Sequence, residues 1–117
     1  METDAFEQLR QRLRQFATER DWDQFHAPKN LAMALSGEVG ELLEHFQWLT
    51  EAESKNLPPE KLALVADELA DVQLYLIRLA DKLNVDLAAT AFKKIDKNAA
   101  KYPVEKAKGR ADKYTAY

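Results

Sequence analysis

The fold is decided by two stretches, LSGEVGELLEHF (residues 35–46) and ADELADVQLYLIRLA (residues 66–80). Apolar residues recur every three or four positions in both, which predicts two amphipathic helices. Each stretch also carries a pair of acids three residues apart, Glu38 with Glu41 and Glu68 with Asp71. Residues three apart lie on the same face of a helix, so each pair directs its carboxylates to one side.

The acids lie beside the apolar stripe of each helix instead of opposite it. At about 100° per residue, the leucines at positions 31, 35 and 42 fall within about 60° of Glu38. The second stripe comprises Val65, Leu69, Val72, Leu76, Leu79 and Leu83, and its residues 65, 72 and 79 fall equally close to Glu68. If the two helices dock through these stripes, all four carboxylates meet along one seam.

Four carboxylates near a core repel one another and lose hydration, and a divalent cation offsets both effects. Zinc prefers Cys and His, whereas the chain has no Cys and two His. The Glu-x-x-His pattern of di-iron bundles is missing, because Leu42 lies three residues before His45. An all-carboxylate site therefore favours Mg²⁺, with Mn²⁺ as a substitute. The alternative is that the acids are solvated or structural charge in a non-catalytic helical dimerisation module.

Four helices and no strand are expected, at about residues 4–20, 28–49, 60–83 and 87–101, with the second ending at Trp48 or Leu49. Thr3 or Asp4 can cap the first helix and Asp86 the fourth. Residues 50–59 form a polar connection, and residues 104–117 form a flexible tail that lacks periodicity. The prediction is an all-α, four-helix bundle and a single domain spanning residues 1–117.

Charge and composition narrow the class of protein. The net charge of −3 hides a basic C-terminal quarter, because residues 93–117 carry eight Lys or Arg and three Asp or Glu, a net of +5. Such a segment suits phosphates, while the acidic remainder suits cations and would repel a nucleic-acid polymer. The absence of Cys suits a cytoplasmic protein. No apolar run approaches the about 20 residues of a membrane span.

The same residues carry a family resemblance. The order Glu38-x-x-Glu41, residues 42–67, Glu68-x-x-Asp71 resembles the signature of the MazG-type all-α nucleoside triphosphate pyrophosphohydrolases. More of the chain resembles their dCTP pyrophosphatase branch, in the segments at residues 22–31, 37–42, 46–48, 68–72, 96–98, 102–103 and 113–115. The similarity covers about residues 20–115, in one order.

The resemblance implies an enzyme that cleaves between the α- and β-phosphates of a nucleoside triphosphate, here dCTP or a modified dCTP, to give a monophosphate and pyrophosphate. It implies that Glu38, Glu41, Glu68 and Asp71 bind Mg²⁺, and that one of them or a nearby carboxylate orients or deprotonates the attacking water. It also implies a homo-oligomer, a tetramer built as a dimer of dimers. The alternatives are a dUTPase-like or a broad-specificity hydrolase of the same family.

Four further residues are candidates for nucleoside binding. Trp22 and Trp48 flank the first acidic helix and could stack on a base, each stack being worth roughly 1–3 kcal/mol. His26 could hydrogen-bond the base or sugar, and Tyr75 lies on the acid side of its helix, where it could pack beneath a sugar. The alternative for the tryptophans is core packing, and for His26 a structural role.

The basic quarter supplies candidates for the triphosphate. Lys94, Asn98 and Lys101 recur on one face of the last expected helix, and Lys113 and Tyr114 follow in the tail. These five residues could meet the phosphates. The alternative is that the lysines form an ordinary solvated face.

Overall fold

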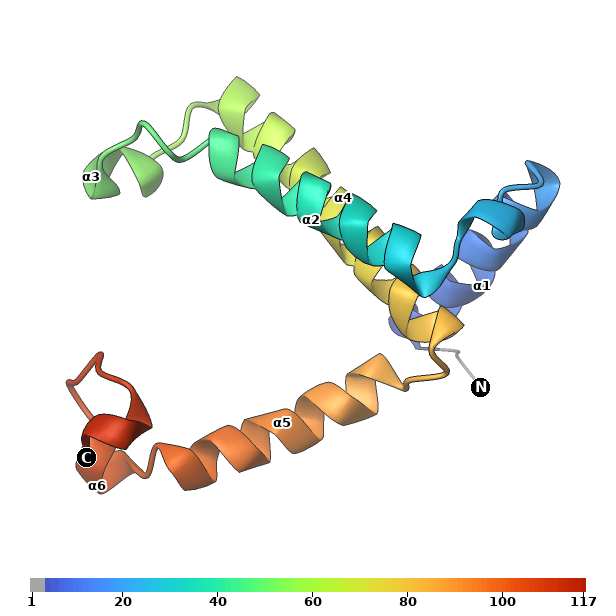
Figure 1. The fold of residues 1–117 in the computed structure, drawn as a ribbon. Helices are drawn as coiled ribbons and strands as arrows, with labels where there is room; N and C mark the ends of the chain where they lie inside the picture. The colour runs from blue at the N-terminus through green and yellow to red at the C-terminus, as the bar shows by residue number, and fades with distance from the viewer. Residues whose placement is uncertain (1–3) are drawn as a thin grey trace. The chain divides into compact units, whose positions relative to one another are not determined.

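The computed structural model describes residues 4–117, and their regular structure is entirely helical (Figure 1). The chain divides after Val85 into two compact units. The first unit contains α1 (Ala5–Glu19), the 3₁₀ helix η1 (Asp23–Phe25), α2 (Pro28–Glu44), α3 (Glu51–Ser54) and α4 (Pro59–Lys82). The second contains α5 (Leu87–Lys101), α6 (Val104–Ala107) and the 3₁₀ helix η2 (Tyr114–Ala116). The all-α prediction is confirmed, and the prediction of a single domain stays a prediction.

Three helices form the core of the first unit. Helices α2 and α4 run side by side in opposite directions, and α1 packs against α4 (Figure 1). The buried apolar side chains come from all three helices and are Ala17, Leu31, Val65, Ile77 and Ala80. The pairing of α2 with α4 positions the acidic residues, because each helix contributes one acid pair.

The helix ends follow local chemistry. The side chain of Asp4 accepts a hydrogen bond of 3.0 Å from the amide of Glu7, and that of Asp86 accepts one of 3.0 Å from Ala89. Both caps were expected, whereas Thr3 lies outside the described residues. Asn84 has a φ of 55°, in the left-handed region that Asn tolerates, and α4 ends just before it.

Two boundaries differ from the prediction. Helix α2 was expected to reach Trp48 or Leu49 but ends at Glu44, because the amides of His45 and Phe46 bond to the carbonyls three residues back and tighten the chain into turns. The expected polar connection contains the short helix α3. A capping box forms it, in which the amide of Glu53 bonds to the Thr50 hydroxyl and the amide of Thr50 bonds to the Glu53 carboxylate.

The C-terminal tail carries regular structure that its lack of periodicity did not predict. The ring of Tyr102 meets Tyr114 and Tyr117 edge-on, at centroid distances of 5.7 and 5.9 Å. The guanidinium of Arg110 lies 4.8 Å from the centre of the Tyr117 ring. Aromatic and cation–π contacts thus stabilise this segment where helical periodicity is missing. Its expected flexibility stays a prediction.

Part of the expected apolar stripe of α4 is not buried. Leu69, Leu76 and Leu83 are 53%, 39% and 53% exposed, and Leu62, seven residues before Leu69, is also exposed. The expected stripe is therefore buried only in part. Within residues 4–117, no helix combines the length and apolarity that crossing a membrane requires.

Candidate functional site

Three carboxylates converge where α2 runs beside α4. Glu38, Glu41 and Glu68 each place a carboxylate oxygen within 4.8 Å of those of the other two. Asp71 lies one turn further along α4 and is not a member of this cluster, which we call the acid cluster. The antiparallel pairing of the two helices thus brings together three of the four expected metal ligands.

The acid cluster is electrostatically uncompensated. One carboxylate oxygen, Oε2, of Glu38 and of Glu68 is buried and has no hydrogen-bond partner among the described residues. Burial, a hydrogen bond with Glu41 and repulsion by the neighbouring carboxylates raise the pKa of Glu38 to about 7. Burial and the charge of Glu41 likewise raise the pKa of Glu68, while His45 opposes the rise from 3.9 Å away. Bringing a cation to these oxygens would satisfy them and relieve the repulsion.

The donor set fits a hard divalent cation. All three groups are carboxylates, and Mg²⁺ binds through one or two carboxylates while its other positions keep water or take phosphate oxygens. The two unpartnered buried oxygens are where such an ion would supply a missing partner. Glu38, Glu41 and Glu68 would hold it, and Asp71 as a fourth ligand stays a prediction.

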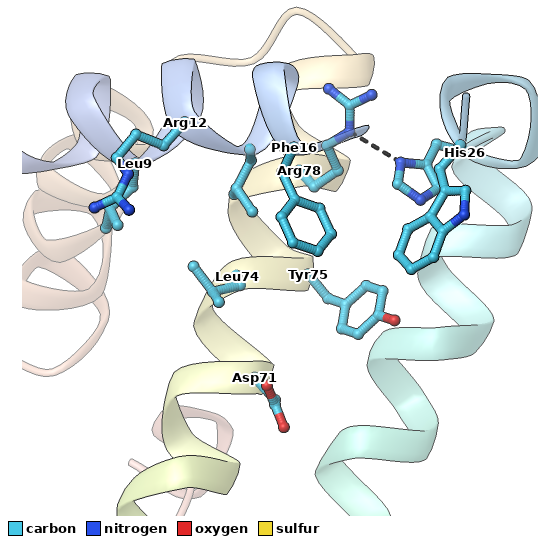
Figure 2. A pocket seen from close by; sticks show the side chains of 10 residues that line it. Leu9, Arg12, Phe16, His26, Asp71, Leu74, Tyr75 and Arg78 are labelled. Carbon is cyan, nitrogen blue, oxygen red and sulfur yellow. Dashed lines mark hydrogen bonds between the residues drawn. The ribbon is translucent and has the colours of Figure 1, made fainter. Parts of the chain in front are cut away.

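A cavity of about 510 Å³ reaches Asp71, one turn along α4 from Glu68 of the acid cluster (Figure 2). Helix α1, the segment after it and α4 form its walls, and Asp71 belongs to the lining. The lining residues are Leu9, Arg12, Leu13, Phe16, Trp22, His26, Asp71, Leu74, Tyr75 and Arg78. The cavity has mostly apolar and aromatic walls with a few polar groups, as is typical of sites for small organic ligands.

Three of the four expected nucleoside-binding residues meet in this cavity. Trp22, His26 and Tyr75 all line it. The Trp22 ring meets Phe16 edge-on at a centroid distance of 5.6 Å, and Trp22 is 45% exposed, so part of its surface is open for stacking. Trp48 is 87% exposed in the turn after α2 and is not among the lining residues. Its stacking role stays a prediction.

Sequence reasoning missed Arg78, which holds the His26 end of the cavity together. Its Nε donates to His26 Nδ1 at 3.1 Å, and its Nη2 donates to Asp23 Oδ1 at 2.7 Å. Burial, and then the charges of Arg78 and Lys82, lower the pKa of His26. Arg78 follows Asp71 by seven residues, so helical spacing places it on the acid side of α4 and could have identified it.

The basic candidates lie in the second unit. Lys94, Asn98 and Lys101 are exposed on α5, and Lys113 and Tyr114 lie at the start of η2. The ammonium of Lys101 lies 5.1 Å from the centre of the Tyr114 ring, so two of the five are neighbours. Their contact with a triphosphate stays a prediction.

The sequence profile of the MazG-like family matches residues 33–116, which include all four predicted ligands. The chain belongs to the MazG-like family. It is 47% identical over 113 residues to dCTP pyrophosphatase 1 of Mus musculus and 45% identical to that of Homo sapiens. Each alignment covers 95% of this chain and 66% of the relative, so the chain spans slightly less than two thirds of these curated relatives.

The fold is also shared with a solved structure. A pyrophosphatase from Archaeoglobus fulgidus superposes with a TM-score of 0.82 at 38% identity, over 88% of this chain and 96% of that one. The resemblance to the family and to its dCTP pyrophosphatase branch is confirmed.

The raised pKa of Glu38 predicts a pH dependence for Mg²⁺ binding to this MazG-like protein. A carboxyl with a pKa of about 7 is protonated below that pH and loses its proton as the pH rises, and a metal binds the deprotonated form. We expect the Mg²⁺ affinity, measured by isothermal titration calorimetry, to be about tenfold weaker at pH 6 than at pH 8. The Glu44→Gln variant, which removes an exposed acid of α2, should keep this dependence. Equal affinities at the two pH values would contradict the prediction.

Proposed function

We propose that this chain is a Mg²⁺-dependent nucleoside triphosphate pyrophosphohydrolase that acts on dCTP or a 5-modified dCTP. Its products would be the nucleoside monophosphate and pyrophosphate. The observation that carries the proposal is an acid cluster with two unpartnered oxygens beside a cavity lined by Trp22, His26 and Tyr75. The dCTP pyrophosphatase relatives support the choice of substrate.

The chemistry divides between the acid cluster and the cavity. Mg²⁺, when bound, would neutralise phosphate charge and make a bound water more acidic. Glu38, Glu41 and Glu68 would hold the cation, and Asp71 lines the cavity one turn further along α4. The oxygen of the attacking water bonds to one phosphorus of the α–β bridge, and a carboxylate oxygen of these four residues accepts the proton of that water. The bond between this phosphorus and the bridging oxygen breaks, which separates the monophosphate from pyrophosphate.

The cavity would bind the nucleoside. Its volume of about 510 Å³ is in the range of small-molecule sites, and its aromatic side chains offer stacking surfaces for a pyrimidine. Trp22 stacks on the base, His26 hydrogen-bonds the base or sugar, and Tyr75 packs beneath the sugar and disfavours a 2′-hydroxyl. Trp48 closes over the base from the turn after α2.

The second unit would bind the triphosphate of the substrate. Residues 93–117 carry a net charge of +5, which suits the phosphates. Lys94, Asn98 and Lys101 contact these phosphates from one face of α5. Lys113 and Tyr114 add to them from η2.

The working form would be a homo-oligomer, a tetramer built as a dimer of dimers. Leu62, Leu69 and Leu76 recur every seven residues along α4, and Leu83 follows at the same spacing directly after its last residue. All four are exposed, and a seven-residue repeat is the spacing of a helix–helix seam. On α5, Phe92 and Ile95 are 72% and 62% exposed. A chain that buries so few large side chains gains stability by covering such faces with further copies of itself.

Substrate choice is tested with a panel of the eight common NTPs and dNTPs. We expect pyrophosphate release to be fastest with dCTP and to require Mg²⁺. A preference for dUTP, or equal rates with all eight, would support the same-family alternatives. No release with any of them would support a non-catalytic dimerisation module.

The acids are tested by removing one charge at a time. We expect Glu41→Gln and Asp71→Asn each to lower turnover by at least about 100-fold, because a lost ligand displaces the ion and its water. Glu44→Gln, on the same helix as Glu41, should keep turnover within a factor of two. Circular dichroism checks that the variants stay folded, and near-normal turnover in a folded Glu41→Gln or Asp71→Asn variant would contradict the shared site.

The seam on α4 is tested by the mass in solution. We expect Leu76→Glu to shift sedimentation toward the monomer, because the new charge would be buried between copies. Ala63→Glu places the same charge at an exposed position on the other side of α4 and should leave the mass unchanged. An unchanged oligomer in Leu76→Glu would exclude the seam as an interface.

A further inference from the structure

Arg78 is a buried charge at the end of the cavity, 6% exposed. Burying a guanidinium is costly unless its donors are paired. Its Nε bonds to His26 Nδ1 at 3.1 Å, its Nη2 to Asp23 Oδ1 at 2.7 Å, and its Nη1 lies 3.6 Å from Asp81 Oδ2. One side chain of α4 thus binds the segment between α1 and α2.

The bond to His26 fixes where the imidazole proton sits. A guanidinium has only donors and stays protonated, so Arg78 Nε cannot accept a hydrogen bond. His26 Nδ1 must therefore be the acceptor and carry no proton. A ring protonated on both nitrogens would direct Nδ1–H against Arg78 Nε–H, so the ring is neutral. Its single proton is then on Nε2.

The position of His26 in the cavity allows this proton to be donated to a ligand. His26 and Trp22 both line the cavity, and the Arg78–His26 bond marks one end of it (Figure 2). Nε2 lies across the ring from Nδ1, so the donor is on the side of the ring away from Arg78. An acceptor oxygen or nitrogen of a ligand could meet it there.

We propose that Arg78 is a positioning residue for substrate binding, which holds His26 as a neutral Nε2–H donor toward an acceptor atom of the bound nucleoside. The inference deepens the proposed function and rests on it. Arg78 then contributes to recognition through His26, which is the residue that contacts the ligand.

The other partners of Asp23 and Asp81 distinguish the positioning role of Arg78 from simple charge pairing. Asp23 also accepts a bond from Lys82 Nζ at 2.5 Å, and Asp81 accepts two from Arg14, at 2.8 and 2.6 Å. Both carboxylates therefore keep a cationic partner when Arg78 is changed, whereas His26 Nδ1 loses the donor that fixes its tautomer. Burial is the largest effect that opposes protonation of His26. The charges of Arg78 and Lys82 oppose it as well, and the charge of Asp23 favours it.

The tautomer is measured directly by long-range ¹H–¹⁵N NMR of the full-length protein with ¹⁵N-labelled histidine. The His26→Ala variant identifies the His26 signals against those of His45. From pH 6.5 to 8 we expect an unprotonated Nδ1 and a protonated Nε2 at His26, and in Arg78→Met, which offers no donor, a mixture of tautomers. A protonated Nδ1 in the unaltered protein would overturn the proposal. This readout needs no substrate, so it decides the tautomer even if the protein hydrolyses no nucleotide.

A double-mutant cycle on dCTP hydrolysis tests whether Arg78 acts through His26. We expect Arg78→Met to raise KM by about fivefold, the effect of one hydrogen bond, while kcat stays within about twofold. In a His26→Ala background the same change should alter KM by less than about twofold. Arg14→Lys, which alters the neighbouring ion pair with Asp81, should leave KM unchanged in both backgrounds. An equal rise in KM with and without His26 would overturn the proposal.

Discussion

Repulsion among the carboxylates at the α2–α4 seam is the constraint on which the rest of the structure depends. Apolar burial, including that of Leu31 and Val65, holds the two helices together. The same pairing brings carboxylate oxygens of Glu38, Glu41 and Glu68 within 4.8 Å of one another. Two oxygens of this cluster are buried without a hydrogen-bond partner among residues 4–117. The carboxylates therefore lower the stability of the folded unit at this seam, and binding a divalent cation there would raise it. A site that is strained without its ion is suited to binding one tightly.

A single helix relates the acid cluster to the cavity. Glu68, Asp71, Tyr75 and Arg78 follow at intervals of three, four and three residues along α4, so they share one side of a rigid rod. The first belongs to the acid cluster, the next two line the cavity, and the last anchors His26. The distance between the acid cluster and the cavity is thus set by helix geometry, which is stiffer than a loop.

Large apolar side chains are exposed in both units. Few apolar side chains of residues 4–117 are fully buried, and large ones such as Leu69, Leu76 and Phe92 are exposed. Apolar patches of this kind are characteristic of protein–protein interfaces. Self-association and catalysis would then share α4, with the leucine edge toward another copy and the acidic edge toward the ligand.

The sequence by itself determined the helices and the facing of the acid pairs, because periodicity and three-residue spacing are local properties. It also predicted ligand binding by Trp22, His26 and Tyr75, and the structure gathers these three residues in one cavity, while their role stays a prediction. It could not show that α2 ends at Glu44, or that Asp71 leaves the acid cluster to line the cavity. Only the tertiary structure decided that Arg78 is buried against His26, because their contact joins residues 52 apart in the chain and depends on how α1, α2 and α4 pack.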